Sequence, residues 1–310
     1  MRIIFLGTPK IAVKTLEVLL KSDHEVIAVV TQPDKKCGRG KKIAFSPIKL
    51  FALSNNLPLF QFESIKKEGV KELKELKPDI MITFAYGQIL SEEVLKVAPH
   101  GVINVHASIL PKYRGAAPIN WAIINGEKET GITIMQTATG VDNGDMISLL
   151  KVDITEEDDA GTLAEKISNL SPKFLLETLQ KIESGKAVWT KQDESKATHY
   201  PMMRNEFGKI NFNETAEIIV NLVRGTTPSP GAYFSFNEKT YKVFKVKKAE
   251  LDHNEKNGTV LVSSSKQGLI VACGNGQSVE IVELQEPNGK RMQAKSYLCG
   301  KKIDINEVLV

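Results

Sequence analysis

The sequence predicts an α/β protein in which a Rossmann-like domain with a mainly parallel sheet precedes a small, OB-like C-terminal β-barrel. In the first half of the 310 residues, short apolar runs rich in β-branched residues alternate with helical patterns, as in βαβ units around a parallel sheet. In the last third, short strand patterns follow one another closely, with Gly and Asn between them, which is typical of small barrels. We therefore expect domains at residues 1–189 and 208–310, joined by a polar linker at 190–207.

The elements of the first domain follow from the spacing of apolar residues. Ser46 and Pro47 occupy the N-cap and first position of one predicted helix. Pro172 is expected to interrupt the last helix, because proline cannot continue the hydrogen-bond ladder. A hairpin-type extension is expected at 145–155. Strands are predicted at residues 2–7, 25–32, 58–62, 79–86, 101–108 and 130–139, and helices at residues 10–21, 46–56, 66–76, 91–97, 116–125 and 160–185.

The second domain is predicted to be mostly strand. One helical pattern, at residues 214–224, precedes a series of short strand patterns that carry the barrel prediction. The strands are predicted at residues 232–237, 240–250, 257–264, 268–276 and 277–285.

Composition restricts the class of protein. The chain is 42% hydrophobic and 25% charged, as soluble globular proteins are, and no apolar run reaches membrane-spanning length. Three cysteines without a CxxC pair and five scattered histidines predict neither a disulfide framework nor a metal site. The first residues enter a strand pattern without the layout of a secretory signal, so a cytoplasmic protein is expected. The net charge of +4 is compatible with an acidic partner but does not require one.

The turn after the first strand argues against a nucleotide cofactor. It reads Gly7-Thr8-Pro9 and lacks the three-glycine fingerprint that lets a dinucleotide approach the backbone. No Walker loop is present either. A nicotinamide or flavin enzyme is therefore not expected, in spite of the Rossmann-like alternation.

The most informative run is NVHASILPKYRG at residues 104–115. Asn104 and His106 lie two apart at the end of an apolar strand pattern, so both point from the same face of the strand. In open α/β sheets, ligands bind at this carboxyl edge. An amide and an imidazole directed at one point suit a carbonyl oxygen that must take on negative charge. The alternatives are a satisfied buried histidine and an asparagine that bonds to the backbone of a turn.

Asp142 is the next candidate, in the loop TGVDNGD after the strand pattern at 130–139. If the two strands are parallel neighbours, this loop lies beside the end of the strand that carries His106. An aspartate there can orient the imidazole and favour its charged, donating form. The alternative is a plain turn residue, because Asp, Asn and Gly are common turn formers.

These motifs together resemble the folate-dependent formyltransferases. The resemblance rests on NVHASILPKYRGAAPI followed by GVDNGDM, and it extends to FLGTP near the start and TQPDKKCGRGKK in a loop. It implies that Asn104, His106 and Asp142 are the catalytic trio and that 10-formyltetrahydrofolate is the co-substrate, with no metal. The residues that it assigns to folate binding are Ser108, Ile109, Leu110, Pro111, Tyr86, Gly87, Gln88, Ile89 and Leu90.

A glycine-flanked basic loop lies between residues 35 and 42. Most runs of charge are solvated surface, but a flexible basic segment also suits nucleic-acid phosphates. The resemblance implies the second reading, because the tRNA-formylating branch of the family carries such a loop. The tRNA-contacting residues expected there are Lys36, Arg39, Lys41 and Lys42. Lysines along one strand of the second domain are further candidates: Lys245 and Lys247, with Lys242 and Lys248 beside them.

The resemblance implies a monomeric enzyme that transfers a formyl group to the amino group of methionyl-initiator tRNA. A formyltransferase acting on a small amine, a formyltetrahydrofolate hydrolase and a non-catalytic RNA-binding protein are the alternatives. The chain departs from the family pattern near the domain boundary, at Met202, Asn205, Asn211 and Phe212. These departures bear on RNA contacts and not on the trio.

Overall fold

The computed structural model describes residues 1–37 and 42–310. The chain forms two compact units, which we describe separately. The first comprises Met1–Gly115, Thr130–Asp153 and Ala164–Tyr200, and the second comprises Ala116–Glu129, Ile154–Leu163 and Pro201–Val310. Within the described part, no helix has both the length and the apolar character that a membrane span requires.

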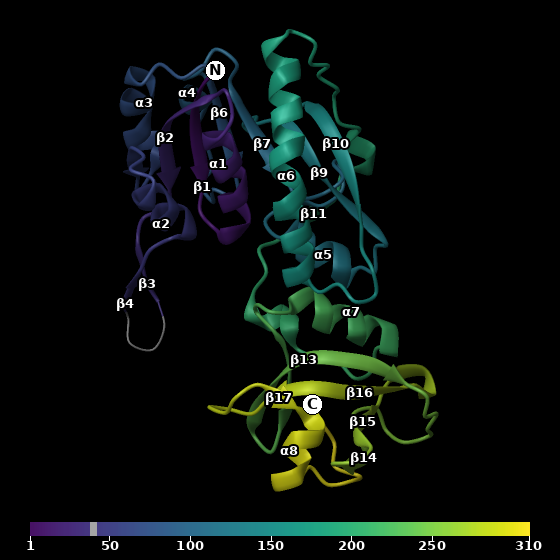
Figure 1. The fold of residues 1–310 in the computed structure, drawn as a ribbon. Coiled ribbons are helices and arrows are strands. Elements are labelled where there is room, and N and C mark those ends of the chain that lie inside the picture. The colour runs from purple at the N-terminus through teal and green to yellow at the C-terminus, as the bar shows by residue number, and fades with distance from the viewer. Residues whose placement is uncertain (38–41) are drawn as a thin grey trace. The chain divides into compact units, whose positions relative to one another are not determined.

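The first unit is built on a seven-stranded sheet in the order β10-β9-β7-β6-β1-β2-β5 (Figure 1). The pairs within β7-β6-β1-β2-β5 are all parallel, which confirms the predicted Rossmann-like core. The pair of β7 and β9 is antiparallel. The strands are β1 Arg2–Gly7, β2 Glu25–Thr31, β5 Leu59–Gln61, β6 Ile80–Phe84, β7 Val102–His106, β9 Glu129–Gln136 and β10 Met146–Asp153.

Helices cover this sheet at the predicted positions. They are α1 Val13–Leu20, preceded by a short 3-10 turn at Lys10–Ala12, α2 Pro47–Ser54, α3 Ile65–Glu75, α4 Glu92–Leu95 and α6 Ala160–Glu183. Residues of α3 and α4 bury against one face of the sheet, in a cluster with Ile4, Met81 and Val102. Ser46 caps α2 as predicted, because its Oγ accepts from the Lys49 N–H at 3.0 Å.

One local prediction for this unit is corrected and another is refined. Helix α6 continues through Pro172 instead of breaking there. The fully buried Ile167, Leu175 and Leu179 anchor the helix on both sides, and their burial offsets a proline cost of about 3 kcal/mol. The sequence predicted only a basic loop at residues 35–42, and the structure adds two short strands at its ends, β3 Lys35–Cys37 and β4 Lys42–Ala44, which form an antiparallel pair.

The second unit is an antiparallel sheet in the order β12-β13-β16-β15-β14, with β17 beside β16. Its strands are β12 Ala232–Phe236, β13 Lys239–Ala249, β14 Val260–Ser264, β15 Gly268–Ala272, β16 Ser278–Gln285 and β17 Met292–Gln293. The ends of this order are not paired with each other among the described strands. The C-terminal segment connects them instead, because Val310 bonds to Ser235 of β12 and Leu309 N–H donates to Gly258 O beside β14.

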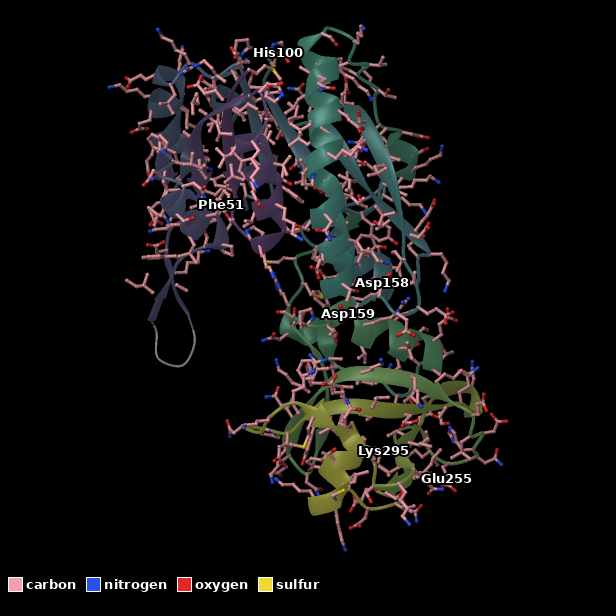
Figure 2. The ribbon with its side chains drawn as sticks, viewed as in Figure 1. Phe51, His100, Asp158, Asp159, Glu255 and Lys295 are labelled. Atoms are coloured by element: carbon pink, nitrogen blue, oxygen red, sulfur yellow. The ribbon has the colours of Figure 1, made fainter. Side chains whose placement is uncertain are left out.

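Two of the helices in the second unit contribute side chains to its core. Helix α5 Pro118–Ile124 and helix α7 Ala216–Thr226 occupy predicted positions, whereas the short helix α8 Ala294–Gly300 was not predicted. Figure 2 shows the side chains of these elements, with Lys295 marking α8. The rings of Phe234 and Tyr241 stack at 5.3 Å between centroids and lie in a core that includes Ile219 of α7.

The Ser46 cap gives a stability prediction. Ser46→Ala removes the acceptor for the Lys49 N–H and should lower the free energy of unfolding by about 1 kcal/mol. Ser54→Ala is the matched control, because the exposed Ser54 hydroxyl bonds only near the end of the same helix, where it donates to Phe51 O and accepts from Asn55 Nδ2. Urea denaturation of the two variants checks this, and an equal effect of both would contradict the capping role.

Candidate active site

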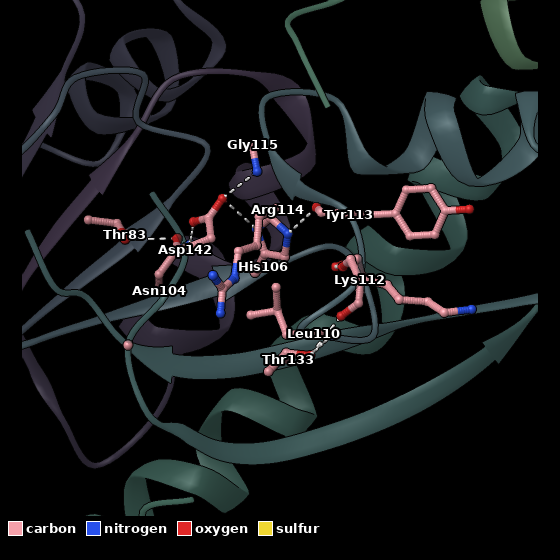
Figure 3. Close-up of polar contacts among 12 residues, drawn as sticks. Thr83, Asn104, His106, Leu110, Lys112, Tyr113, Arg114, Gly115, Thr133 and Asp142 are labelled. Carbon is pink, nitrogen blue, oxygen red and sulfur yellow. Dashed lines mark hydrogen bonds and ion pairs between the residues drawn. The ribbon is translucent and has the colours of Figure 1, made fainter. Parts of the chain in front are cut away.

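The site lies at the carboxyl end of β7, where Asn104 and His106 point from the same face (Figure 3). Thr83 of β6 lies opposite Asn104 in the parallel register. Its hydroxyl donates to Asn104 Oδ1 at 2.9 Å. With its oxygen occupied in this way, the amide turns Nδ2 towards Asp142, where it donates to Oδ1 at 3.4 Å.

The imidazole of His106 is buried, with 5% of the residue exposed. Its Nε2 lies 2.9 Å from the carbonyl oxygen of Tyr113. Because a carbonyl oxygen only accepts, Nε2 carries the hydrogen. The other nitrogen, Nδ1, faces Asp142 Oδ2 at 3.6 Å. The side chains of Asn104 and His106 therefore converge on the two oxygens of a single carboxylate.

Asp142 reaches this place by a different route from the one that the sequence suggested. The expectation of parallel neighbouring strands is wrong, because β9 runs antiparallel to β7 and pairs Gln136 with Ile103. The chain after β9 forms a closed loop in which Gln136 N–H donates to Asp145 O at 2.8 Å. At Gly144 a Cβ would lie 1.9 Å from Gln136 O, so this closure requires glycine.

The conformation of Asp142 is that of a turn residue, and its carboxylate also lies beside His106. Its φ is +48°, a left-handed turn conformation that Asp tolerates better than most residues. Its Oδ2 accepts from the Gly115 N–H at 2.8 Å. The residue is thus a turn former whose carboxylate is held against His106.

The segment Ser108–Pro111 follows β7 and is tied to β9. Thr133 Oγ1 donates to Ser108 O at 2.7 Å and accepts from Leu110 N–H at 3.2 Å. The Ser108 hydroxyl donates to Lys112 O at 2.7 Å. Leu110 is buried, whereas Ile109 and Pro111 are partly exposed, and the peptide bond between Leu110 and Pro111 is cis.

The loop Tyr86–Leu90 follows β6 at the same edge of the sheet. Tyr86 and Leu90 belong to the core, and burial raises the pKa of the Tyr86 hydroxyl. The amide of Gln88 accepts from Ile65 N–H at 2.9 Å and donates to Phe62 O at 2.8 Å. Gly87 is exposed with a φ of +90°, and Ile89 is 76% exposed. Gly87 and Ile89 therefore form the exposed part of this loop.

Sequence reasoning missed two residues of this site, Arg114 and Gln192. The guanidinium of Arg114 is buried and bonds to Gln192 and Glu194, and it holds the pKa of the Glu194 carboxyl below its usual range. Gln192 in turn donates to the backbone of Asp142. No local signal marks them, because Gln192 lies in a stretch whose polar composition indicates a linker.

The predicted basic contacts divide into two groups. Arg39 and Lys41 lie outside the described residues, as do the side chains of Lys36 and Lys42. On β13, Lys247 pairs with Glu280 at 2.9 Å, and the exposed Lys245 lies opposite Glu283.

The residues at which the chain departs from the expected pattern have ordinary structural surroundings. Phe212 is part of the core of the second unit, and Asn211 accepts from Asn213 N–H at 3.1 Å. Met202 and Asn205 are exposed.

The site contains no obvious place for a metal. Among residues 1–37 and 42–310, no group of three or more His, Cys, Asp or Glu side chains has a metal-binding arrangement. The groups that the site offers are an amide donor, an imidazole and a carboxylate, which can stabilise a developing oxyanion and move a proton.

Known proteins resemble the chain over its whole length. Residues 1–179 match the formyl transferase family and residues 202–302 match the formyl transferase C-terminal domain. Methionyl-tRNA formyltransferase from Caldanaerobacter subterraneus subsp. tengcongensis is 47% identical, covering 100% of both chains. The enzyme of the same name from Acetivibrio thermocellus is also 47% identical, over 100% of this chain and 99% of that one.

Solved structures share the fold at lower identity. WlaRD, a sugar 3N-formyl transferase solved in the presence of dTDP and 5-N-formyl-THF, superposes with a TM-score of 0.68 and 23% identity. The match covers 94% of this chain and 99% of that one.

Gly115 gives a test of the site's framework. It has a φ of +105°, and a Cβ would lie 2.3 Å from Tyr200 O, across the pair of β8 Arg114–Gly115 and β11 His199–Tyr200. Gly115→Ala should lower the free energy of unfolding by about 1–3 kcal/mol from strain alone, and by more through the clash. Gly185→Ala is the control, because Gly185 has a φ of +67° and nothing within 4 Å of its Cβ position. Equal losses in chemical denaturation would contradict the importance of the close approach.

Proposed function

The chain belongs to the formyl transferase family, and we propose on this premise that it transfers the formyl group of 10-formyltetrahydrofolate to the amino group of methionyl-initiator tRNA. The observation that carries the proposal is the convergence of Asn104 and His106 on Asp142. Full-length relatives that bear the name methionyl-tRNA formyltransferase support tRNA as the acceptor.

Asn104 and His106 are suited to stabilise the oxygen of the transferred group. When an amine attacks a formyl carbon, the formyl oxygen takes on negative charge. Asn104 Nδ2 and His106 Nδ1 already face the oxygens of a carboxylate, so they are oriented towards an anion before a substrate arrives. Because Nε2 carries a hydrogen, His106 Nδ1 donates when the ring is in its doubly protonated form. Donors placed in advance in this way cost little reorganisation during the reaction.

Asp142 is suited to accept a proton. The amine of the acceptor must lose a proton to attack, and the Asp142 carboxylate is the proton acceptor beside the two donors. As the new amide bond forms, the bond between the formyl carbon and N10 breaks, and N10 takes up a proton so that tetrahydrofolate leaves. Its side chain is 18% exposed, so it is not sealed off from an incoming amine. Gly115 N–H holds Oδ2 in place, and the pairing with His106 keeps the imidazole oriented while the proton moves.

The folate-binding assignment rests on the surface at the end of β6 and β7. The reduced folate supplies the formyl group. The exposed Ile89 and the backbone of Gly87 fit a flat ring with an apolar face and polar edges, and the partly exposed Ile109 and Pro111 offer a second apolar surface. The remaining residues assigned to folate binding hold these two segments in place: Tyr86, Gln88, Leu90, Ser108 and Leu110.

The tRNA assignment rests on the basic segment that begins at Lys35 and on the second unit. Lys36, Arg39, Lys41 and Lys42 lie within seven residues of sequence, and such a run of positive charge suits phosphate contacts. On β13, Lys245 is a better candidate than Lys247, whose charge Glu280 partly neutralises. We place the enzyme in the cytoplasm, since its proposed substrate belongs to translation, and we propose the monomer that the family resemblance implies.

One assay separates this function from its alternatives. The protein is incubated with 10-formyltetrahydrofolate and charged initiator tRNA, and formylmethionyl-tRNA and formate are both measured. Formylated tRNA is the expected product. Formate release without an acceptor would indicate a hydrolase, and formylation of a small amine in preference to tRNA would indicate the other branch of the family.

Removal of either donor should slow the reaction strongly. Asn104→Ala and His106→Ala should each lower kcat by about 100- to 1,000-fold, the usual effect of losing an oxyanion donor. His100→Ala is the control, because His100 is exposed and precedes β7 at its other end. Thermal unfolding checks that the variants are folded. A folded variant with near-normal kcat would refute the assignment of that residue.

A substitution at Asp34 tests how the β3–β4 pair is anchored. Lys49 Nζ donates to Asp34 Oδ2 at 2.6 Å and lies 4.1 Å from the centre of the Phe45 ring, so it grips the residues just before β3 and just after β4. Asp34→Asn weakens the contact with Lys49, and it also removes a negative charge beside the basic residues. Electrostatics alone would then lower the KM for tRNA, whereas loss of the anchor should raise it several-fold.

The control for Asp34→Asn is Asp23→Asn, which changes the charge equally at another exposed position. Steady-state kinetics gives the KM values for tRNA and for the formyl donor. The KM for the formyl donor should stay unchanged. A KM for tRNA that falls or stays constant in the Asp34 variant would refute the anchoring role.

A further inference from the structure

The guanidinium of Arg114 is one of the most buried charges in the described part of the chain, with 2% of the residue exposed. Burial of a charge is costly unless the group is fully hydrogen-bonded. Its Nη1 and Nη2 donate to the Glu194 carboxylate at 2.9 and 2.6 Å. Its Nε and Nη2 donate to Gln192 Oε1 at 3.0 and 2.8 Å. The charge is therefore shared between a carboxylate and an amide oxygen.

These bonds fix the orientation of the Gln192 amide. An arginine only donates, so the atom that faces Arg114 must be the amide oxygen. The Nε2 group then points the other way, where it donates to Asp142 O at 2.8 Å and to Gly144 O at 2.7 Å. Both hydrogens of the amide group are used on the loop that carries Asp142.

The loop depends on such an outside partner. Asp142 has a φ of +48°, a conformation that persists only where the surroundings hold it. The loop lies between β9 and β10 and its carbonyl groups at 142 and 144 have no place in the sheet ladder. Gln192 supplies their donors from a segment 50 and 48 residues away in the sequence.

We propose that Gln192 is a positioning residue for formyl transfer. Gln192 holds the backbone of Asp142 in place, and Arg114 fixes the orientation of the Gln192 amide. The Asp142 carboxylate is thereby placed beside both Asn104 and His106. The inference rests on the proposed function, because it assumes that Asp142 acts in the reaction. Glutamine is the residue type that this position requires, since it accepts from a cation on one side and donates to two carbonyls on the other.

The test replaces Gln192 by glutamate. Gln192→Glu keeps an acceptor for Arg114 but directs a carboxylate oxygen at two carbonyl oxygens, so it should release the loop without exposing the buried arginine. We expect kcat to fall by about 10-fold or more, as small misplacements of reacting groups do. The KM for 10-formyltetrahydrofolate should stay within about twofold, because that binding does not depend on the Asp142 backbone.

Ser195→Ala is the matched control in the same segment. The Ser195 hydroxyl donates only to Asp193 Oδ1, within its own turn, so kcat should not change. Thermal unfolding of all variants is measured in parallel. A Gln192→Glu variant that folds normally and keeps kcat within about twofold of the parent would overturn the proposal.

A double-mutant cycle with Asp142→Asn distinguishes a positioning role of Gln192 from a merely structural one. If Gln192 acts through Asp142, the double variant should be no slower than Asp142→Asn alone. Multiplying effects would show that Gln192 acts independently, which overturns the inference. An Asp142→Asn variant with normal kcat would instead refute the role of Asp142 in the proposed function, and the inference with it.

Discussion

The site depends on keeping one carboxylate in an unfavourable loop conformation beside two donors. Asp142 lies after a strand that runs antiparallel to β7, so the sheet itself carries the chain away from His106. The closure of the loop at Gly144 and the bond from Gly115 N–H to Asp142 Oδ2 bring the carboxylate back. These restraints place the carboxylate against Asn104 and His106.

The buried Arg114 explains why a polar stretch of chain folds onto this unit. Residues 190–200 contain few apolar side chains that could drive packing. Three contacts hold them. Gln192 and Glu194 accept hydrogen bonds from Arg114, β11 pairs with β8, and the rings of Tyr113 and Tyr200 stack at 4.9 Å between centroids. A single internal charge thus organises the strand that supplies Gly115 and the glutamine that holds the loop.

The other end of the sheet edge shows a similar use of polar contacts. Thr8 Oγ1 and Gln32 Nε2 both donate to Tyr86 O, at 2.9 and 3.2 Å, which ties the ends of β1 and β2 to the predicted folate loop. Gln61 Nε2 donates to Gln32 O at 2.9 Å and Lys49 Nζ donates to Gln61 Oε1 at 2.8 Å. Hydrogen bonds through Gln32 and Gln61 therefore connect the predicted folate loop to Lys49, which contacts residues on both sides of the β3–β4 pair.

Features that depend on neighbours along the chain could be predicted from the sequence. The two-residue period of a strand places Asn104 and His106 on one face, the Ser46-Pro47 pair starts α2, and apolar spacing locates most helices. The tertiary structure alone decided the contacts of Asp142, Arg114 and Gln192. Arg114 and Gln192 are 78 residues apart, and the direction of β9 reversed the expected path to Asp142. Strand direction, loop closure and the partners of a buried charge depend on which distant segments meet, and no local pattern encodes that.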